Sequence, residues 1–144
     1  MQLSHEHVET MIRHCRAELP NEACGVLAGA GDTVSAVHCL ENARHSTVAY
    51  ELSAAGYLLV ADLDDAGQLL GVFHSHPRGE AYPSPTDRRQ AAWDIPYVII
   101  SLQDRTDPVM RSFHIAKASP GDMTDLGTIT EENLEISDNG TVDA

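Results

Sequence analysis

The chain has 144 residues, and its 9 lysines and arginines against 22 aspartates and glutamates give it a net charge of −13. This length is typical of a single domain. Nucleic acids and anionic membranes bind proteins largely through phosphate contacts, so a surface this acidic excludes both as expected partners. Lys117 is the sole lysine. The shortage of lysine along the whole chain favours a salt-rich cytosol, where charges are screened; an ordinary acidic protein with an acidic tail is the alternative.

The cysteine pattern and the N-terminus predict a cytoplasmic protein. Cys15, Cys24 and Cys39 are odd in number and form no C-x-x-C pair, so we expect a reducing compartment and interpret all three as core residues. The first ten residues do not resemble a secretory signal, and no apolar run approaches the roughly 20 residues that span a bilayer.

The first half of the chain predicts a helix, a hairpin and a second helix. Apolar residues recur at helical spacing between Ser4, a favourable helix cap, and Leu19. A turn then joins strands predicted at residues 23–29 and 33–40. The other elements predicted here are a short strand at residues 49–52 and a helix from Ser53 to about Gly67.

The second half predicts strands at residues 69–76, 96–102 and 109–115, with a helix that begins after Ser84. Together these elements predict a mixed α/β domain of about three helices and six to eight strands. We divide the chain into this domain, residues 1–118, and an acidic tail, residues 119–144, that can add one short strand at 134–136.

The segment from His74 to Asp87 carries the candidate chemistry. On a strand, residues i and i+2 project to the same face, so His74 and His76 can both reach one ion. Asp87, in the first turn of the next helix, can supply a third ligand. Imidazole nitrogen and carboxylate oxygen are zinc ligands, and three protein ligands with one open position are typical of a catalytic zinc site.

Each of these residues also has an ordinary structural interpretation. Asp87 and Ser84 can form the capping box of their helix. His5 and His7 show the same spacing as the candidate ligands, but they lie in a predicted helix, where i and i+2 do not face each other, so we place them on the surface. Only the combination of the strand pair with a downstream acid points to a metal.

The combination resembles the JAMM (MPN+) metalloprotease family. H-S-H-P occupies residues 74–77, S-P-T-D follows at 84–87, and Glu22 lies far upstream, as in the family motif. The flanking segments P-N-E-A-C-G at 20–25 and E-A-Y-P at 80–83 resemble the short prokaryotic members, and the similarity covers roughly residues 4–115. Without the resemblance, Glu22 would be interpreted as a surface acid near a strand edge.

The resemblance implies a role for each motif residue. His74, His76 and Asp87 would bind one zinc ion, Glu22 would be the general base, and Ser84 would donate a hydrogen bond to the oxyanion. It also implies a zinc-dependent isopeptidase that cleaves after the C-terminal glycine of a ubiquitin-like modifier attached to lysine. The partner would then be the modifier, with its Gly-Gly tail, and its conjugates.

Two alternatives to the isopeptidase remain open. The enzyme can instead release cysteine from a sulfur-carrier protein, or the domain can be a non-catalytic binding module for ubiquitin-like tails with a structural zinc. A zinc nucleobase deaminase is excluded, because the chain lacks the P-C-x-x-C that supplies its zinc-binding cysteines.

Overall fold

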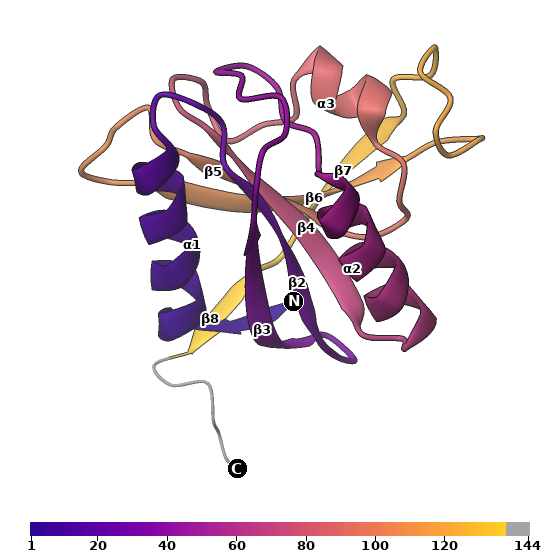
Figure 1. Ribbon diagram of the computed structural model, residues 1–144, viewed down its shortest axis with the longest axis horizontal. Helices are drawn as coiled ribbons and strands as arrows, with labels where there is room; N and C mark the ends of the chain where they lie inside the picture. The colour runs from indigo at the N-terminus through magenta and orange to yellow at the C-terminus, as the bar shows by residue number, and fades with distance from the viewer. Residues whose placement is uncertain (138–144) are drawn as a thin grey trace.

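The computed structural model describes residues 1–137; residues 138–144 of the predicted acidic tail lie outside the described part. One eight-stranded mixed sheet is flanked by three helices (Figure 1), which confirms the predicted mixed α/β class. The strand order across the sheet is β7-β6-β5-β4-β2-β3-β1-β8. In chain order the elements are β1 (Gln2–Ser4), α1 (His5–Glu18), β2 (Cys24–Ala30), β3 (Thr33–Leu40), α2 (Ala54–Asp65), β4 (Leu69–His76), α3 (Pro85–Gln90), β5 (Tyr97–Ser101), β6 (Val109–Ala116), β7 (Thr128–Glu132) and β8 (Glu135–Ser137).

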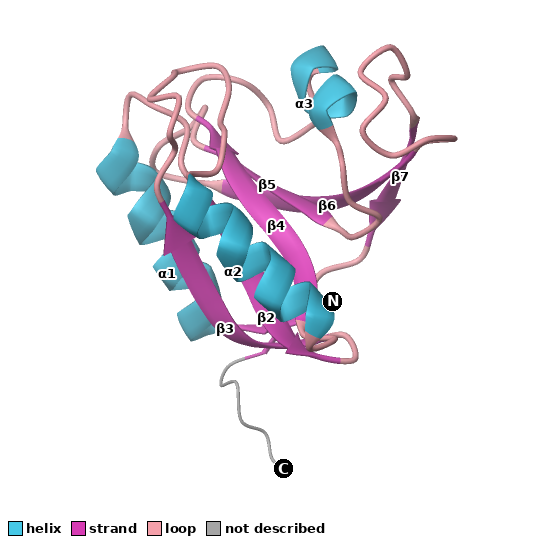
Figure 2. Cartoon of the chain, turned by 45° about the vertical axis from the view of Figure 1, so that its right-hand side comes forward, coloured by secondary structure: helices cyan, strands magenta, loops and turns pink. Residues whose placement is uncertain are grey.

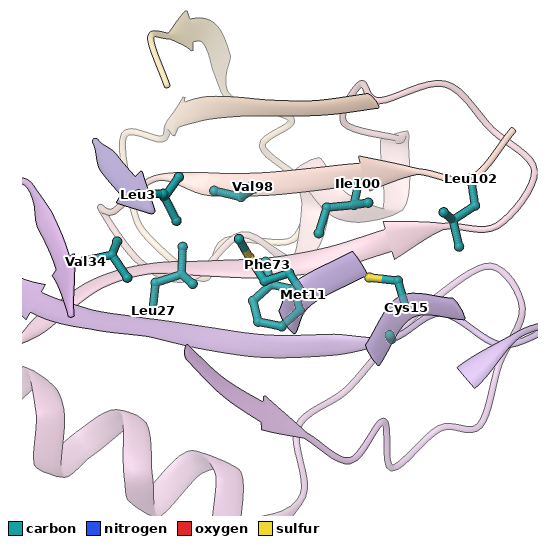
Figure 3. Close-up of a cluster of buried hydrophobic side chains, with 10 residues drawn as sticks. Leu3, Met11, Cys15, Leu27, Val34, Phe73, Val98, Ile100 and Leu102 are labelled. Atoms are coloured by element: carbon teal, nitrogen blue, oxygen red, sulfur yellow. The ribbon is translucent and has the colours of Figure 1, made fainter. Parts of the chain in front are cut away.

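Alternate side chains of the central strands divide the core between the two faces of the sheet. Leu27 of β2 and Phe73 of β4 pack in a cluster with residues of α1 (Figure 3). Val26 and Val72, one position away on the same strands, pack in a second cluster with Val60 of α2. Because the side-chain period of a strand is two, α1 and α2 cover opposite faces (Figure 2).

Strand pairing brings distant segments to one end of the sheet. β4 runs antiparallel to β2 and parallel to β5, with Cys24 of β2 opposite His74 of β4. The start of β2 therefore meets the end of β4. α3 lies in the crossover from β4 to β5, so it emerges at this same end.

The segment at residues 49–52 is not the predicted strand. Leu52 makes one isolated bridge with Asn42, and no strand forms around it. The buried side chain of Asn42 instead bonds to the main chain of this loop, accepting from Arg44 and Glu51 and donating to Ala49. A side chain that satisfies so many backbone groups replaces the ladder that a strand would need.

The C-terminal segment contributes two strands, of which one is predicted by the sequence. β8 overlaps the predicted strand at residues 134–136 and pairs parallel with β1. β7, which pairs antiparallel with β6, is missed, because Ile129 is its only large apolar residue, two acids follow Thr130, and the strand is mostly exposed. Its alternation is therefore too weak to recognise.

Two further structural findings bear on the expectations from sequence. Cys15 and Cys24 are buried as predicted, but Cys39 is exposed, which corrects its placement in the core. β2 covers one edge of β3 as far as Cys39, which lies opposite Gly25, but on the other edge β1 pairs with β3 only at Gln2 and Thr33. Within residues 1–137, none of the helices is long and apolar enough to cross a membrane.

Candidate metal centre and catalytic cleft

The end of β4 presents two buried imidazoles on one face of the sheet. His74 and His76 are 1% and 8% exposed, and their Nε2 atoms lie 3.1 Å apart. Both follow Val72 at intervals of two residues, so they lie on the face that α2 covers. The predicted placement of this pair is confirmed in the fold.

Asp87 of α3 completes a triangle of ligand atoms. Its Oδ2 lies 3.2 Å from Nε2 of His74 and 3.0 Å from Nε2 of His76. Ligands at ~2.0–2.1 Å from a tetrahedral zinc are about 3.3 Å from one another. The three atoms therefore already have the spacing that a zinc ion requires, and they are the one such group of His, Cys, Asp or Glu among the described residues.

A capping box fixes the orientation of Asp87. The backbone N–H of Asp87 donates to Oγ of Ser84 at 3.1 Å, and the N–H of Ser84 donates to Oδ2 of Asp87 at 2.9 Å. The capping interpretation and the ligand interpretation of these residues are thus compatible. The same carboxylate oxygen that accepts the cap bond faces the two imidazoles.

The two imidazoles are oriented by different contacts. Nδ1 of His76 is 2.7 Å from the carbonyl of Glu80, so this nitrogen donates and leaves Nε2 as the free acceptor. His74 stacks on Tyr50, with ring centroids 4.6 Å apart, and its buried Nδ1 has no partner among residues 1–137. Sequence reasoning missed Tyr50, since an aromatic residue in a loop gives no periodic signal.

Glu22 lies in the interior, two residues before β2 begins, and not at an exposed strand edge. Its side chain is 3% exposed, and Oε1 is buried without a hydrogen-bond partner in the described structure. The adjoining Ala23 exchanges two hydrogen bonds with Ser75, which lies between the two histidines on β4. Pairing of β2 with β4 therefore carries Glu22 to the triad.

Asn42 holds the backbone of Glu22 from the other side. Its amide donates to the Glu22 carbonyl at 2.9 Å, and the N–H of Glu22 donates to the carbonyl of Ser46 at 2.8 Å. Sequence reasoning missed Asn42 as well, because one asparagine in a polar loop has no distinguishing pattern. The loop at residues 42–51 thus supports both Glu22 and His74, the latter through Tyr50.

The electrostatics of the site separate its two carboxyl groups. Burial raises the pKa of Glu22 to about 7; Asp87 adds to this effect and the histidines oppose it. Burial also acts to raise the pKa of Asp87, but His74 and His76 outweigh it and hold that pKa well below its usual range. Although burial lowers the pKa of His76, its bond to Asp87 prevails and raises it. The carboxyl of Glu22 is thus suited to proton transfer, and the carboxylate of Asp87 is suited to holding a cation.

A cleft of about 330 Å³ opens beside the triad. Glu22, His76 and Ser84 line it together with Val48 and Arg78. The five residues singled out in the sequence therefore meet at one place, and three of them, Glu22, His76 and Ser84, line the same cleft. Of the other histidines considered, His5 is exposed, and His7 accepts the N–H of Ser4 as the second partner of the α1 capping box.

Comparison with known proteins identifies relatives over most of the chain. The family model described as prokaryotic homologs of the JAB domain matches residues 4–116. A CysO-cysteine peptidase of Mycobacterium tuberculosis is 34% identical over 134 residues, which cover 90% of this chain and 86% of that protein. A desampylase of Haloferax volcanii is 38% identical over 94 residues, which cover 59% of this chain and 68% of that protein.

Solved structures show the same fold. The Desulfitobacterium hafniense protein DSY2949 has a TM-score of 0.79 and 34% identity, covering 96% of this chain and 93% of its own. A JAB1/MPN domain protein of Archaeoglobus fulgidus has a TM-score of 0.58 and 16% identity, covering 94% and 98% of the two chains. By the extent of the family match and the identity to its relatives, this chain belongs to the prokaryotic JAB domain family.

Proposed function

We propose that the protein is a zinc-dependent isopeptidase that cleaves the amide bond between the C-terminal glycine of a ubiquitin-like modifier and a lysine. One observation carries the proposal. Three ligand atoms lie 3.0–3.2 Å apart beside a cleft, which one of the ligands, His76, lines together with the buried Glu22, whose Oε1 has no partner among residues 1–137. A metal ion with its bound water would satisfy both the triad and the unpaired Oε1 of Glu22.

His74, His76 and Asp87 would hold one zinc ion, which when bound lowers the pKa of its water to about 7 and polarises a carbonyl. Glu22 is the proton carrier of the site. A carboxyl whose pKa burial raises to about 7 accepts a proton from the attacking water and returns it to the leaving lysine amine near neutral pH. A bound cation would lower this pKa, which favours the acceptor state at the start of the reaction.

Ser84 is the candidate oxyanion donor. Its Oγ accepts the N–H of Asp87, so its hydroxyl hydrogen remains available to a group in the cleft. Since Ser84 caps the helix that carries a metal ligand, the donor is fixed relative to the metal. Donors of this kind contribute about 10²–10³ in rate.

The names of two relatives support a ubiquitin-like or sulfur-carrier protein as the substrate, and each name favours a different candidate activity. One is named a desampylase and another a CysO-cysteine peptidase. We therefore keep release of cysteine from a sulfur-carrier protein as the second candidate activity. The acidic, lysine-poor composition supports a salt-rich cytoplasm and with it the first candidate.

A hydrolysis assay in molar salt tests the proposal. The substrates are a modifier–lysine conjugate and a sulfur carrier–cysteine adduct, and the samples are the wild type, the chelator-treated protein and Glu22→Ala. Cleavage of the conjugate by the wild type, lost on chelation and restored by zinc, is the expected result. Cleavage of the adduct alone would select the second activity.

Glu22→Ala distinguishes the enzyme from a non-catalytic binding module. We expect this variant to retain one zinc per chain but to lose hydrolysis, because the residue lies beside the triad without being part of it. If zinc binds and neither substrate is cleaved by the wild type, the domain is a binding module for ubiquitin-like tails.

A further inference from the structure

α3 carries the ligand Asp87, yet the core does not hold this helix. It has only six residues, and none of them is buried. Isolated helices shorter than ~12–15 residues are marginal in water, so helix propensity does not account for the position of α3. The core reaches it only at its C-cap, Ala91, and its tertiary hydrogen bonds supply the remaining contacts.

Apart from the contacts of Asp87 with the two histidines, the tertiary hydrogen bonds of α3 are made with one stretch of the C-terminal segment, residues 117–132, which we call the strap. Arg88 donates from Nε to the carbonyl of Leu126 and from Nη2 to that of Gly127, both at 2.8 Å. Lys117 donates from Nζ to the carbonyls of Arg89, at 2.6 Å, and Asp122, at 3.1 Å. Figure 2 shows the loop that leads into β7 beside α3.

Hydrogen bonds within the strap fix its conformation where it meets α3. Asp125 accepts the N–H groups of Ala118 and Gly127, which closes the loop. Gly127 has a φ of +70°, and a Cβ there would come within 2.9 Å of the carbonyl oxygen of Ala116. β7 then joins the sheet through β6. The carbonyls that Arg88 reaches are therefore fixed relative to the sheet that carries the histidines.

The strap also contacts the loop after β4 indirectly, through Arg111 of β6. Glu131 of β7 forms a two-point ion pair with Arg111, with N···O distances of 2.7 and 3.0 Å. Arg111 also donates from Nη1 to the carbonyl of Ala81 at 3.2 Å and lies over the ring of Phe113. Ala81 adjoins Glu80, whose carbonyl fixes the tautomer of His76.

We propose that the strap positions the metal ligands, holding Asp87 through Arg88 and Lys117 and the orienting carbonyl of Glu80 through Arg111. These three residues are a third of the chain's nine cations, and each one donates to a backbone carbonyl. In this acidic protein the C-terminal segment thus acts as a positioning element of the site. The inference rests on the proposed zinc site.

Arg88→Ala is the primary test, with Arg89→Ala as its matched control. Both variants remove an arginine from the end of α3, so both lose the same favourable interaction with the helix dipole. Arg89 is exposed, and its side chain has no hydrogen bond among residues 1–137. We expect Arg88→Ala to weaken zinc binding about tenfold in a chelator competition, as for other outer partners of metal ligands, and Arg89→Ala to leave it unchanged.

Two readouts separate positioning from general destabilisation. Backbone hydrogen exchange of the metal-free protein should accelerate at α3 in Arg88→Ala but not in the central strands. The visible absorption of the cobalt-loaded protein should change in the same variant. Arg88→Lys, which keeps the cation but replaces the two separate donor nitrogens of the guanidinium with a single ammonium, should recover part of the loss.

Gly127→Ala disturbs the acceptor side without altering α3. Because its backbone lies in the left-handed region and the added Cβ meets the carbonyl of Ala116, we expect it to reproduce the effect of Arg88→Ala on exchange and on zinc affinity. If Arg88→Ala and Gly127→Ala both match Arg89→Ala, the strap proposal is overturned while the zinc site stands. A wild type that binds no zinc contradicts the zinc site itself, and with it the ligand-positioning role.

Discussion

The three candidate metal ligands come from two regions built in opposite ways. His74 and His76 belong to β4, which is hydrogen bonded on both edges and packed on both faces. Asp87 belongs to a six-residue helix without a buried residue, held by its cap and by the strap. The difference suggests that the core sets where the metal binds, while surface contacts set how well the third ligand reaches it.

Replacement of the proposed base, Glu22, should have the largest effect and should leave both regions intact. We expect Glu22→Gln to lower kcat by about 10²–10⁴-fold, the usual contribution of a general acid–base group. Zinc content should stay at the wild-type value, since Glu22 is outside the triad. Steady-state kinetics with metal analysis on the same samples check this; a simultaneous loss of zinc would make Glu22 a ligand.

Truncation of the core beneath β4 tests the strand region. Phe73 lies in β4 directly before His74, and its side chain is fully buried. Phe73→Ala should lower the free energy of unfolding by about 3–5 kcal/mol, measured by denaturant titration of the metal-free protein. A smaller loss would mean that β4 does not form the rigid part of the site.

The corresponding change in the helix region should act on catalysis more than on stability. Ser84→Ala removes the cap and the hydroxyl together, so we expect about 10²–10³-fold lower kcat but only about 1 kcal/mol of lost stability. Ser84→Thr is the matched control, because threonine keeps a capping hydroxyl. Comparison of kcat with unfolding curves would contradict this assignment if activity and stability fell in proportion.

The raised pKa of Glu22 makes the stability of the metal-free protein pH dependent. Its pKa is raised from 4.5 to about 7 in the folded state, mainly by burial. The folded protein therefore binds this proton more tightly, and its extra stability is present below pH 4.5 and is lost as the pH rises through about 7. Unfolding titrations across this window should show a loss in wild type that is absent from Glu22→Gln.

The smallest expected effect concerns the surface as a whole. If the charge of −13 is an adaptation to a salt-rich cytosol, screening of its self-repulsion should raise Tm in molar salt. Thermal unfolding at low and molar salt measures this. A Tm that does not rise with salt removes the halophilic hypothesis and leaves the site unaffected.

The two regions also differ in how far the sequence predicts them. The histidine pair follows from the two-residue period of a buried strand, and the helix that begins at Ser84 follows from its cap and proline. Glu22 is identified only through its resemblance to a family motif, because its burial depends on a distant loop. No local pattern predicts that Asn42 holds the Glu22 carbonyl.

The strap is the clearest limit of prediction from sequence. Residues 119–137 appear as an acidic tail because hydrophobic periodicity is the main signal of structure, and β7 has almost none. This segment is held by the ladder of β7 with β6 and by hydrogen bonds from Arg88 and Lys117 to its backbone carbonyls. Such bonds depend on main-chain geometry, which residue types do not encode locally.

The pairing of β2 with β4 has a consequence for the order in which the site is assembled during folding. The three candidate metal ligands lie within one short stretch, from β4 to α3, but the position of Asp87 also depends on the strap, which follows them in the chain. Glu22 arrives only when Ala23 meets Ser75, a contact between residues 52 apart in sequence. Loop closure over such a distance is entropically costly and comes after local contacts. The candidate site is therefore complete only after both the pairing of β2 with β4 and the contacts of the strap with α3 have formed.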